Sequence, residues 1–280
     1  MGKKSRRKGQ VKKERMPFVA RTFEGLPAEG DWIALREFVP SATARVTLQD
    51  GEEVLVCSLL PGGGAGIRRP DGEVWLGLQV LHNFGDVSRD LAAAVEAARE
   101  TEPGNPVRLT DPGVGPRLQD LVDPASSFDV EVHEGFDFWV AGTDAEGSDA
   151  LAQANESVAP TERLTTVDAA YWTRMGDKRY LRWVVTQDEG RVLDGLARLA
   201  ARGDEGLGDG TRLIGMFRAH GLLVPVWEMD ADHADGAAPL EEPLSALAAR
   251  LDEAASADAA LTADERRTRQ ELSSRQLTIR

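Results

Sequence analysis

The chain has 280 residues, of which 41% are hydrophobic and 29% are charged, and its net charge is −14 at pH 7. These fractions exclude a chain that is disordered overall, and two domains of roughly 100 residues each are an ordinary solution at this length. No stretch approaches the roughly 20 apolar residues of a membrane-spanning helix, so we expect no transmembrane segment.

The first 15 residues form a basic tail with eight cationic side chains and one carboxylate, a net of +7, which leaves −21 for the other 265 residues. Residues 1–16 have almost nothing apolar to bury, so we predict that they are disordered. The candidate binding residues of the tail are Lys3, Lys4, Arg6, Arg7, Lys8, Lys12 and Lys13. Such a tail can engage nucleic acid or the ribosome, an anionic membrane surface, or the acidic body itself, and these readings stay open.

No apolar segment long enough for an export signal follows the basic residues, so the sequence predicts a cytoplasmic protein. The strongly acidic body argues against general nucleic-acid binding outside the tail or a local patch, because its charge repels phosphate.

Residues 17–102 are predicted to form a first α+β domain. Alternating apolar residues from 42 to 80, with turns at 50–51 and 70–72, predict an antiparallel meander. A helix should follow, capped by Asp86 or Ser88. Cys57, the single cysteine, lies in an apolar run that predicts a buried and unreactive thiol, with a catalytic cysteine as the alternative.

Five prolines between residues 103 and 127 exclude a long helix or a central strand there, and we interpret this stretch as an interdomain linker. A second α+β domain is predicted over 128–230. Its expected elements are hairpins over 128–140, 171–185 and 211–229 and a helix over 192–200.

Two C-terminal helices are expected over 240–277, the second opened by a capping box of Thr262 and Glu265. The predicted fold class is therefore α+β, with antiparallel sheet meanders each followed by a packed helix, in two halves, plus a C-terminal helical pair. Whether the halves arose by duplication stays open.

The motifs that carry chemistry are few. The glycine-rich stretch 61–66 lacks the lysine and serine or threonine of a phosphate loop and favours a hairpin loop, with a ligand-covering flap as the alternative. The four histidines lack paired metal-ligand spacing, so no metal site and no cofactor is predicted. His82 to Asp86 joins a strand to a helix, where side chains can converge on a ligand, although a histidine bonded to the backbone explains it too.

Cations and aromatic residues interleave between positions 171 and 183, which is the chemistry of base stacking combined with phosphate contact. The candidate cations are Arg174, Arg179 and Arg182, and the aromatic residues are Tyr171, Trp172, Tyr180 and Trp183. Period-two alternation places rings and cations on both faces of a strand, so a packed sheet with arginine stems over rings is the competing interpretation.

Several segments carry a likeness to a known family. They are Phe18-Val19-Ala20-Arg21, Phe23-Glu24-Gly25-Leu26-Pro27, residues 31–40, Tyr171-Trp172 with residues 174–177, and residues 215–227. Over nearly its whole length the chain resembles an uncharacterised actinobacterial domain of unknown function, whose members bear genome labels such as translocase-related or topoisomerase. The resemblance implies a cytoplasmic location, one whole-length unit and no reaction. Some members carry a cysteine-rich zinc motif, which a single cysteine excludes here.

Our leading hypothesis is a non-catalytic binding or adaptor protein, with an acidic body for a protein or small-ligand partner and a basic tail that adds electrostatic affinity. The alternative is a small hydrolase or transferase with a site near His82 to Asp86, joined by Arg212, Arg218 or His220. The sequence does not separate them.

Overall fold

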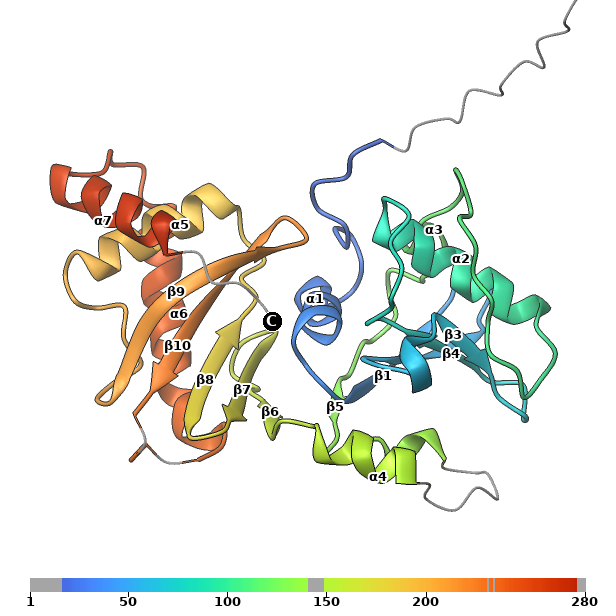
Figure 1. The fold of residues 1–280 in the computed structure, drawn as a ribbon. Helices are drawn as coiled ribbons and strands as arrows, with labels where there is room; N and C mark the ends of the chain where they lie inside the picture. Colours follow the sequence, from blue (N-terminus) through green and yellow to red (C-terminus); the bar gives the residue numbers. More distant parts are fainter. Residues whose placement is uncertain (1–16, 141–148, 231, 234, 276–280) are drawn as a thin grey trace, which may run out of the picture.

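The structure is a computed structural model that describes residues 17–140, 149–230, 232–233 and 235–275 (Figure 1). The predicted basic tail, with its candidate residues Lys3, Lys4, Arg6, Arg7, Lys8, Lys12 and Lys13, lies outside the described residues. Two five-stranded sheets and the helices around them make up the fold, which confirms the predicted α+β class and its C-terminal helical pair. No helix in the described ranges is long and apolar enough to cross a bilayer.

The helices are α1 (Glu29–Glu37), α2 (Val87–Glu100), α3 (Leu118–Leu121), α4 (Asp149–Glu156), α5 (Glu189–Ala200), α6 (Glu241–Ser256) and α7 (Ala263–Ser274). The strands are β1 (Ala42–Thr47), β2 (Glu53–Cys57), β3 (Gly66–Arg68), β4 (Val74–Gly77), β5 (Glu131–Val132), β6 (Thr161–Arg163), β7 (Ala170–Met175), β8 (Lys178–Trp183), β9 (Thr211–Ala219) and β10 (Leu222–Met229). Short 3₁₀ turns lie at Pro61–Gly63, Asp137–Trp139 and Ala238–Leu240.

The first sheet has the order β3-β4-β2-β1-β5. The β1–β2 hairpin turns at Gly51, whose φ of 89° suits glycine, as the sequence indicated. The predicted meander is wrong at the next step, because β4 pairs with β2 in parallel. The chain leaves β2 through Pro61–Gly63, forms the edge strand β3, and returns between β3 and β2.

The predicted hairpin over 128–140 is also wrong. Only Glu131–Val132 forms a strand, β5, and it pairs with β1 of the first sheet. Residues Asp137–Trp139 instead form a 3₁₀ turn, in which Trp139 stacks on Phe136 with ring centroids 4.2 Å apart. Phe138 and Trp139 pack against a cluster of the first sheet that includes Cys57 and Trp75, which accounts for the aromatic residues that had suggested a strand.

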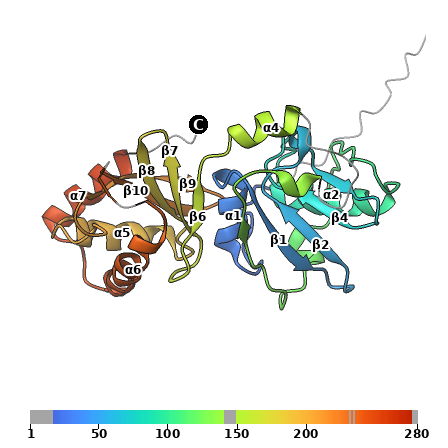
Figure 2. The same cartoon turned by 90° about the horizontal axis from the view of Figure 1, so that it is seen from below.

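The second sheet has the order β6-β7-β8-β10-β9, and its hairpins β7–β8 and β9–β10 are antiparallel as predicted. Helices α5, α6 and α7 cover its outer face (Figures 1 and 2). A cluster that includes Trp172, Leu196 and Leu247 forms the core between this face and the helices. Thr262 and Glu265 form the predicted capping box at the start of α7.

Helix α1 lies between the two sheets, which the views from two directions both show (Figures 1 and 2). Trp32, Ile33 and Leu35 are fully buried, and one hydrophobic cluster joins them to Val54 of the first sheet and Val226 of the second. The inner face of the second sheet therefore packs on the same helix as the first sheet, and a single core connects both halves.

The segment 103–127, which we interpreted as a linker, makes contacts within the first half. Pro106 bridges to Ile67, Val122 bridges to Leu48, and Leu118 of α3 is 1% exposed. The described chain enters the second sheet through α4 and β6. The predicted division into domains stays a prediction, to which these contacts add that the proline-rich stretch packs on the first sheet.

Candidate functional site

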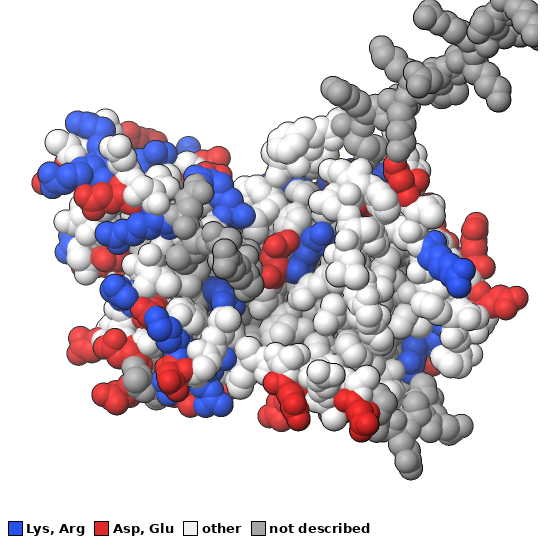
Figure 3. Space-filling model, viewed as in Figure 1, with Lys and Arg blue, Asp and Glu red and all other residues white. Residues whose placement is uncertain are grey.

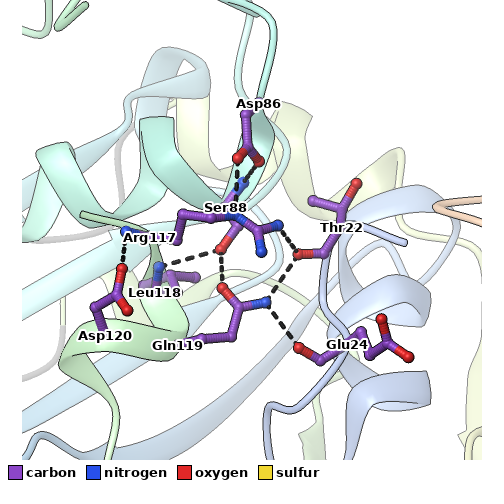
Figure 4. A network of polar contacts seen from close by, with 8 residues as sticks. All are labelled: Thr22, Glu24, Asp86, Ser88, Arg117, Leu118, Gln119 and Asp120. Atoms are coloured by element: carbon purple, nitrogen blue, oxygen red, sulfur yellow. Dashed lines mark hydrogen bonds and ion pairs between the residues drawn. The ribbon is translucent and has the colours of Figure 1, made fainter. Parts of the chain in front are cut away.

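Asp86, one of the predicted site residues, has a structural position at the start of α2. It is 4% exposed, and its carboxylate accepts a hydrogen bond from the Ser88 amide, which makes it the predicted N-cap. Its second oxygen accepts from Arg117 Nε at 2.7 Å. Figure 4 shows the network that continues from this pair.

The network fastens the segment before α1 to α2 and α3. Arg117 Nη2 and Gln119 Nε2 both donate to the Thr22 carbonyl, at 2.7 and 2.9 Å, and Gln119 also donates to the Glu24 carbonyl at 3.1 Å. Ser88 Oγ donates to Gln119 Oε1 at 2.6 Å. The donors and acceptors of these side chains bond to one another and to the backbone. The network therefore stabilises the fold at this junction and leaves none of these hydrogen bonds to a ligand.

His82 is not joined to Asp86 by any contact in the described part of the chain. Its ring lies 5.1 Å from the Phe84 ring. The neighbouring carboxylate of Asp90 accepts from the Phe84 amide at 2.8 Å, and burial raises the pKa of Asp90. The structure therefore does not bring together the two residues that the sequence had singled out at this junction.

Most residues of the predicted aromatic and cationic cluster are either buried or paired with a carboxylate of the chain. Tyr171, Trp172 and Trp183 are at most 7% exposed, so their faces are not open for base stacking. Arg174 and Arg179 both pair with Asp235.

The cations named for the enzyme alternative are paired as well. Arg212 pairs with Glu228 at 2.7 Å and Arg218 pairs with Glu189 at 2.7 Å. Figure 3 shows this mixing of charge over the second sheet and its helices, beside a largely uncharged face of the first half.

A groove on the outer face of the first sheet has a volume of about 530 Å³. Side chains that point away from the core form its floor, because alternate residues of a strand face opposite sides. The lining includes Thr43, Arg45, Glu53, Leu55 and Trp75 of the sheet, together with Ser127, Asp129, Glu131, His133 and Phe138 from the segment around β5.

The floor of this groove is fixed by polar contacts around one indole. Trp75 Nε1 donates to Glu73 at 2.7 Å, and the same carboxylate pairs with Arg45 at 2.5 Å. The Arg69 guanidinium lies 4.4 Å from the Trp75 ring centroid and donates to the Trp139 carbonyl. These contacts fix the position of the Trp75 ring on the floor, which suits a preformed binding surface.

The rim of the groove is acidic. Glu53, Asp129 and Glu131 line it, while the one arginine on its floor, Arg45, is already paired with Glu73. The groove is therefore expected to have a negative potential and to prefer cationic ligands.

His133 is the imidazole of the groove. Its Nε2 lies 2.8 Å from Thr43 Oγ1, and its Nδ1 lies 3.9 Å from Glu131. The order hydroxyl, imidazole and carboxylate is that of a nucleophile array, but 3.9 Å is too long for a hydrogen bond that would orient the ring. Thr43 also lies on β1 between β2 and β5, where the ladders engage the backbone and offer no oxyanion site.

Local sequence patterns did not reveal this groove, because Thr43 and His133 are 90 residues apart and meet only through the β1–β5 pairing. The one signal was the acidic, aromatic stretch from 128 to 140, which we took for a hairpin. No cluster of three or more potential metal ligands occurs within the described ranges.

A family model described as a family of unknown function (DUF5926) matches residues 22–280. Searches of curated proteins and of solved structures return no match.

Proposed function

The chain belongs to DUF5926, a family of unknown function, and we propose that it is a cytoplasmic binding protein whose acidic groove receives a basic segment of a protein partner. The observation that carries the proposal is an aromatic and aliphatic floor, formed by Trp75, Phe138 and Leu55, beneath a rim of carboxylates.

The chemistry of the groove matches a lysine or arginine beside an apolar residue. The long stem of such a cation lies well on aromatic rings, while its charged head reaches the rim. Glu53 on β2 and Glu131 on β5 lie on opposite sides of β1, so an extended peptide crossing the sheet passes between them. The peptide backbone does not have to pair with a free strand edge, because side chains of the groove make the contact.

The same geometry favours binding over catalysis. Thr43 is 7% exposed, and no carboxylate of the described residues is hydrogen-bonded to the His133 imidazole beside it. A hydroxyl nucleophile needs a base that is held by a third group and donors for the developing oxyanion. Covalent labelling of Thr43 by a fluorophosphonate probe, abolished by His133→Gln, would instead support the hydrolase alternative.

Phage display of random octapeptides on the full-length protein tests the proposal. We expect enrichment of peptides that combine lysine or arginine with an apolar residue, because the groove offers one surface for each. The double variant Glu53→Lys, Glu131→Lys should weaken the best peptide at least tenfold, about 1.4 kcal/mol.

The matched control is the double variant Glu242→Lys, Glu253→Lys, which reverses two charges at exposed positions of α6 and should change the affinity less than twofold. Enrichment of acidic peptides, or equal loss of affinity in the control, would contradict the groove as the site. Binding of the peptides by the groove variant at wild-type affinity would do the same.

The tail remains a separate part of the proposal. Its predicted contact with nucleic acid or ribosome is supported only by its eight cations. Partner capture with and without nuclease treatment separates the two contacts, because a groove-bound protein partner survives the nuclease and a partner held through nucleic acid does not.

A further inference from the structure

We propose a second binding site, for a carboxylate or phosphate group, at Arg182 in the groove between the second sheet and the end of α1. It is distinct from the acidic groove in position, in charge and in the ligand that it selects. The proposal does not depend on the proposed function.

Arg182 is placed by the register of the second sheet. It lies opposite Tyr171 of β7 and Val226 of β10, both of which belong to the core around α1. Its side chain therefore points to the inner face of the sheet. The guanidinium carbon lies 5.6 Å from the Phe38 ring centroid and 5.9 Å from the Tyr180 ring centroid. The two rings hold the planar fork at the groove.

Arg182 differs from its neighbours on the β7–β8 hairpin in having no carboxylate partner. Arg174 and Arg179 share Asp235, and Lys178 pairs with Glu228. Throughout the described part of the chain, no carboxylate lies within 4.0 Å of the Arg182 guanidinium, whose side-chain hydrogen bond is a donation to Met175 Sδ at 3.1 Å. Thioether sulfur is a weak acceptor, so most of the five N–H donors remain for a ligand.

Burial makes this unpaired charge costly. Arg182 is half-buried, and desolvation lowers its pKa. A guanidinium in such surroundings gains most from a partner that restores its charge balance, and bidentate carboxylate and phosphate groups match its geometry. A site that retains an unpaired arginine is therefore suited to an anion that arrives from outside the chain.

The nearest acidic side chain of the groove, Glu37, is already engaged. Its carboxylate lies 2.8 Å from His220 Nε2 and 3.6 Å from Arg36 Nε. Burial alone would raise the pKa of Glu37, but the contacts with His220 and Arg36 lower it on balance. Glu37 therefore stays ionised with its charge offset locally, which leaves the Arg182 end of the groove positive.

The groove has a volume of about 240 Å³ and is built by both halves. Pro40 follows α1, Gln79 follows β4, and Met175 ends β7. Gln79 Nε2 donates hydrogen bonds to the Leu35 and Val39 carbonyls. Its amide group therefore holds the wall of the groove in place and is not free to bind the anion. The space and its apolar wall suit a small organic acid, a phosphate ester or the acidic side chain of a partner.

Side-chain NMR of the full-length protein tests the site directly. Titration with inorganic phosphate, and separately with acetate, at constant ionic strength should shift the Arg182 Nε–Hε signal saturably, with a dissociation constant on the order of 1–10 mM. Loss of that signal in Arg182→Lys assigns it. A shift with phosphate alone identifies a phosphoryl ligand, and a shift with acetate alone identifies a carboxylate.

Calorimetry of variants gives the control. Arg182→Gln should weaken binding of the better anion at least tenfold. Arg179→Gln removes a cation on the opposite face of the same strand that is already paired with Asp235, and it should change the affinity less than twofold. Neither anion shifting the wild-type signal, or Arg182→Gln binding with unchanged affinity, would overturn the proposal. The wild-type titration decides even if a variant fails to fold.

Discussion

Tyr171 on β7 donates a hydrogen bond of 2.6 Å from its hydroxyl to Asp31 on α1, across 140 residues of chain. Both side chains are buried, and Asp31 also pairs with Arg163 of β6 at 3.0 Å. The contact joins the helix of the shared core to the sheet of the other half. It is polar in apolar surroundings, so its removal should be costly.

Asp31→Asn should lower the free energy of unfolding by about 3 kcal/mol or more, because it leaves the Arg163 guanidinium without its carboxylate. Tyr171→Phe should cost only about 1–2 kcal/mol, since the Asp31–Arg163 pair survives. Urea unfolding at pH 7 measures both. Equal losses in the two variants would show that the ion pair contributes little.

Alkaline pH should unfold the protein through Tyr171. Burial raises the pKa of this phenol well above its ordinary value near 10, and the Asp31 carboxylate adds to the effect. The unfolded state alone then releases the proton, so stability is complete below about pH 10 and falls as the pH rises further. In Tyr180→Phe, which retains one tyrosine, tyrosinate absorbance should appear together with unfolding. Ionisation that precedes unfolding would contradict this.

Cys57 should be inert in the native protein, as predicted from its apolar run. The thiol is fully buried, and burial raises its pKa above the ordinary value. A disulfide reagent at pH 8 should modify no thiol in the native state and one in denaturant. Fast native modification would require opening of the turn over Asp137–Trp139, whose rings pack beside it.

Gln119→Met should loosen the segment before α1 without unfolding the body. It removes the side-chain donors to the Thr22 and Glu24 carbonyls, a loss of about 1–2 kcal/mol. Amide hydrogen exchange over residues 22–26 should accelerate about tenfold while α5 keeps its protection. Arg108→Met, an exposed change in the same half, is the control. If exchange over residues 22–26 is unchanged in Gln119→Met, the hydrogen bond from Arg117 to the Thr22 carbonyl alone holds this segment.

Elements with a one-sided pattern could be predicted from the sequence. The hairpin β7–β8 alternates on either side of Gly176, and α5 has an apolar stripe that packs on one layer. Helix α1 was missed, because residues Asp31 to Leu35 are buried on every side and show no stripe. A helix that packs against two sheets has apolar residues on both sides, so hydrophobic periodicity does not identify it.

The sites depend on pairing between distant segments. The acidic groove exists because β5 joins β1. The sequence singled out Arg182 for its place among aromatic residues, three of which, Tyr171, Trp172 and Trp183, prove buried. Whether a cation is paired depends on distant residues. Asp235, the partner of Arg179, is separated from it in the chain by α5, β9 and β10. A local pattern contains no information of that kind.

The position of α1 sets the order in which the chain can complete its fold during synthesis. Asp31 leaves the ribosome 140 residues before Tyr171, which at about 5–20 residues per second is a wait of roughly 7–28 s. During that interval Trp32 and Ile33 lack the second sheet that covers them in the finished core. We expect nascent chains arrested before β7 to leave α1 open to protease and those released after β10 to protect it. The helix that is made first is thus among the last to be enclosed.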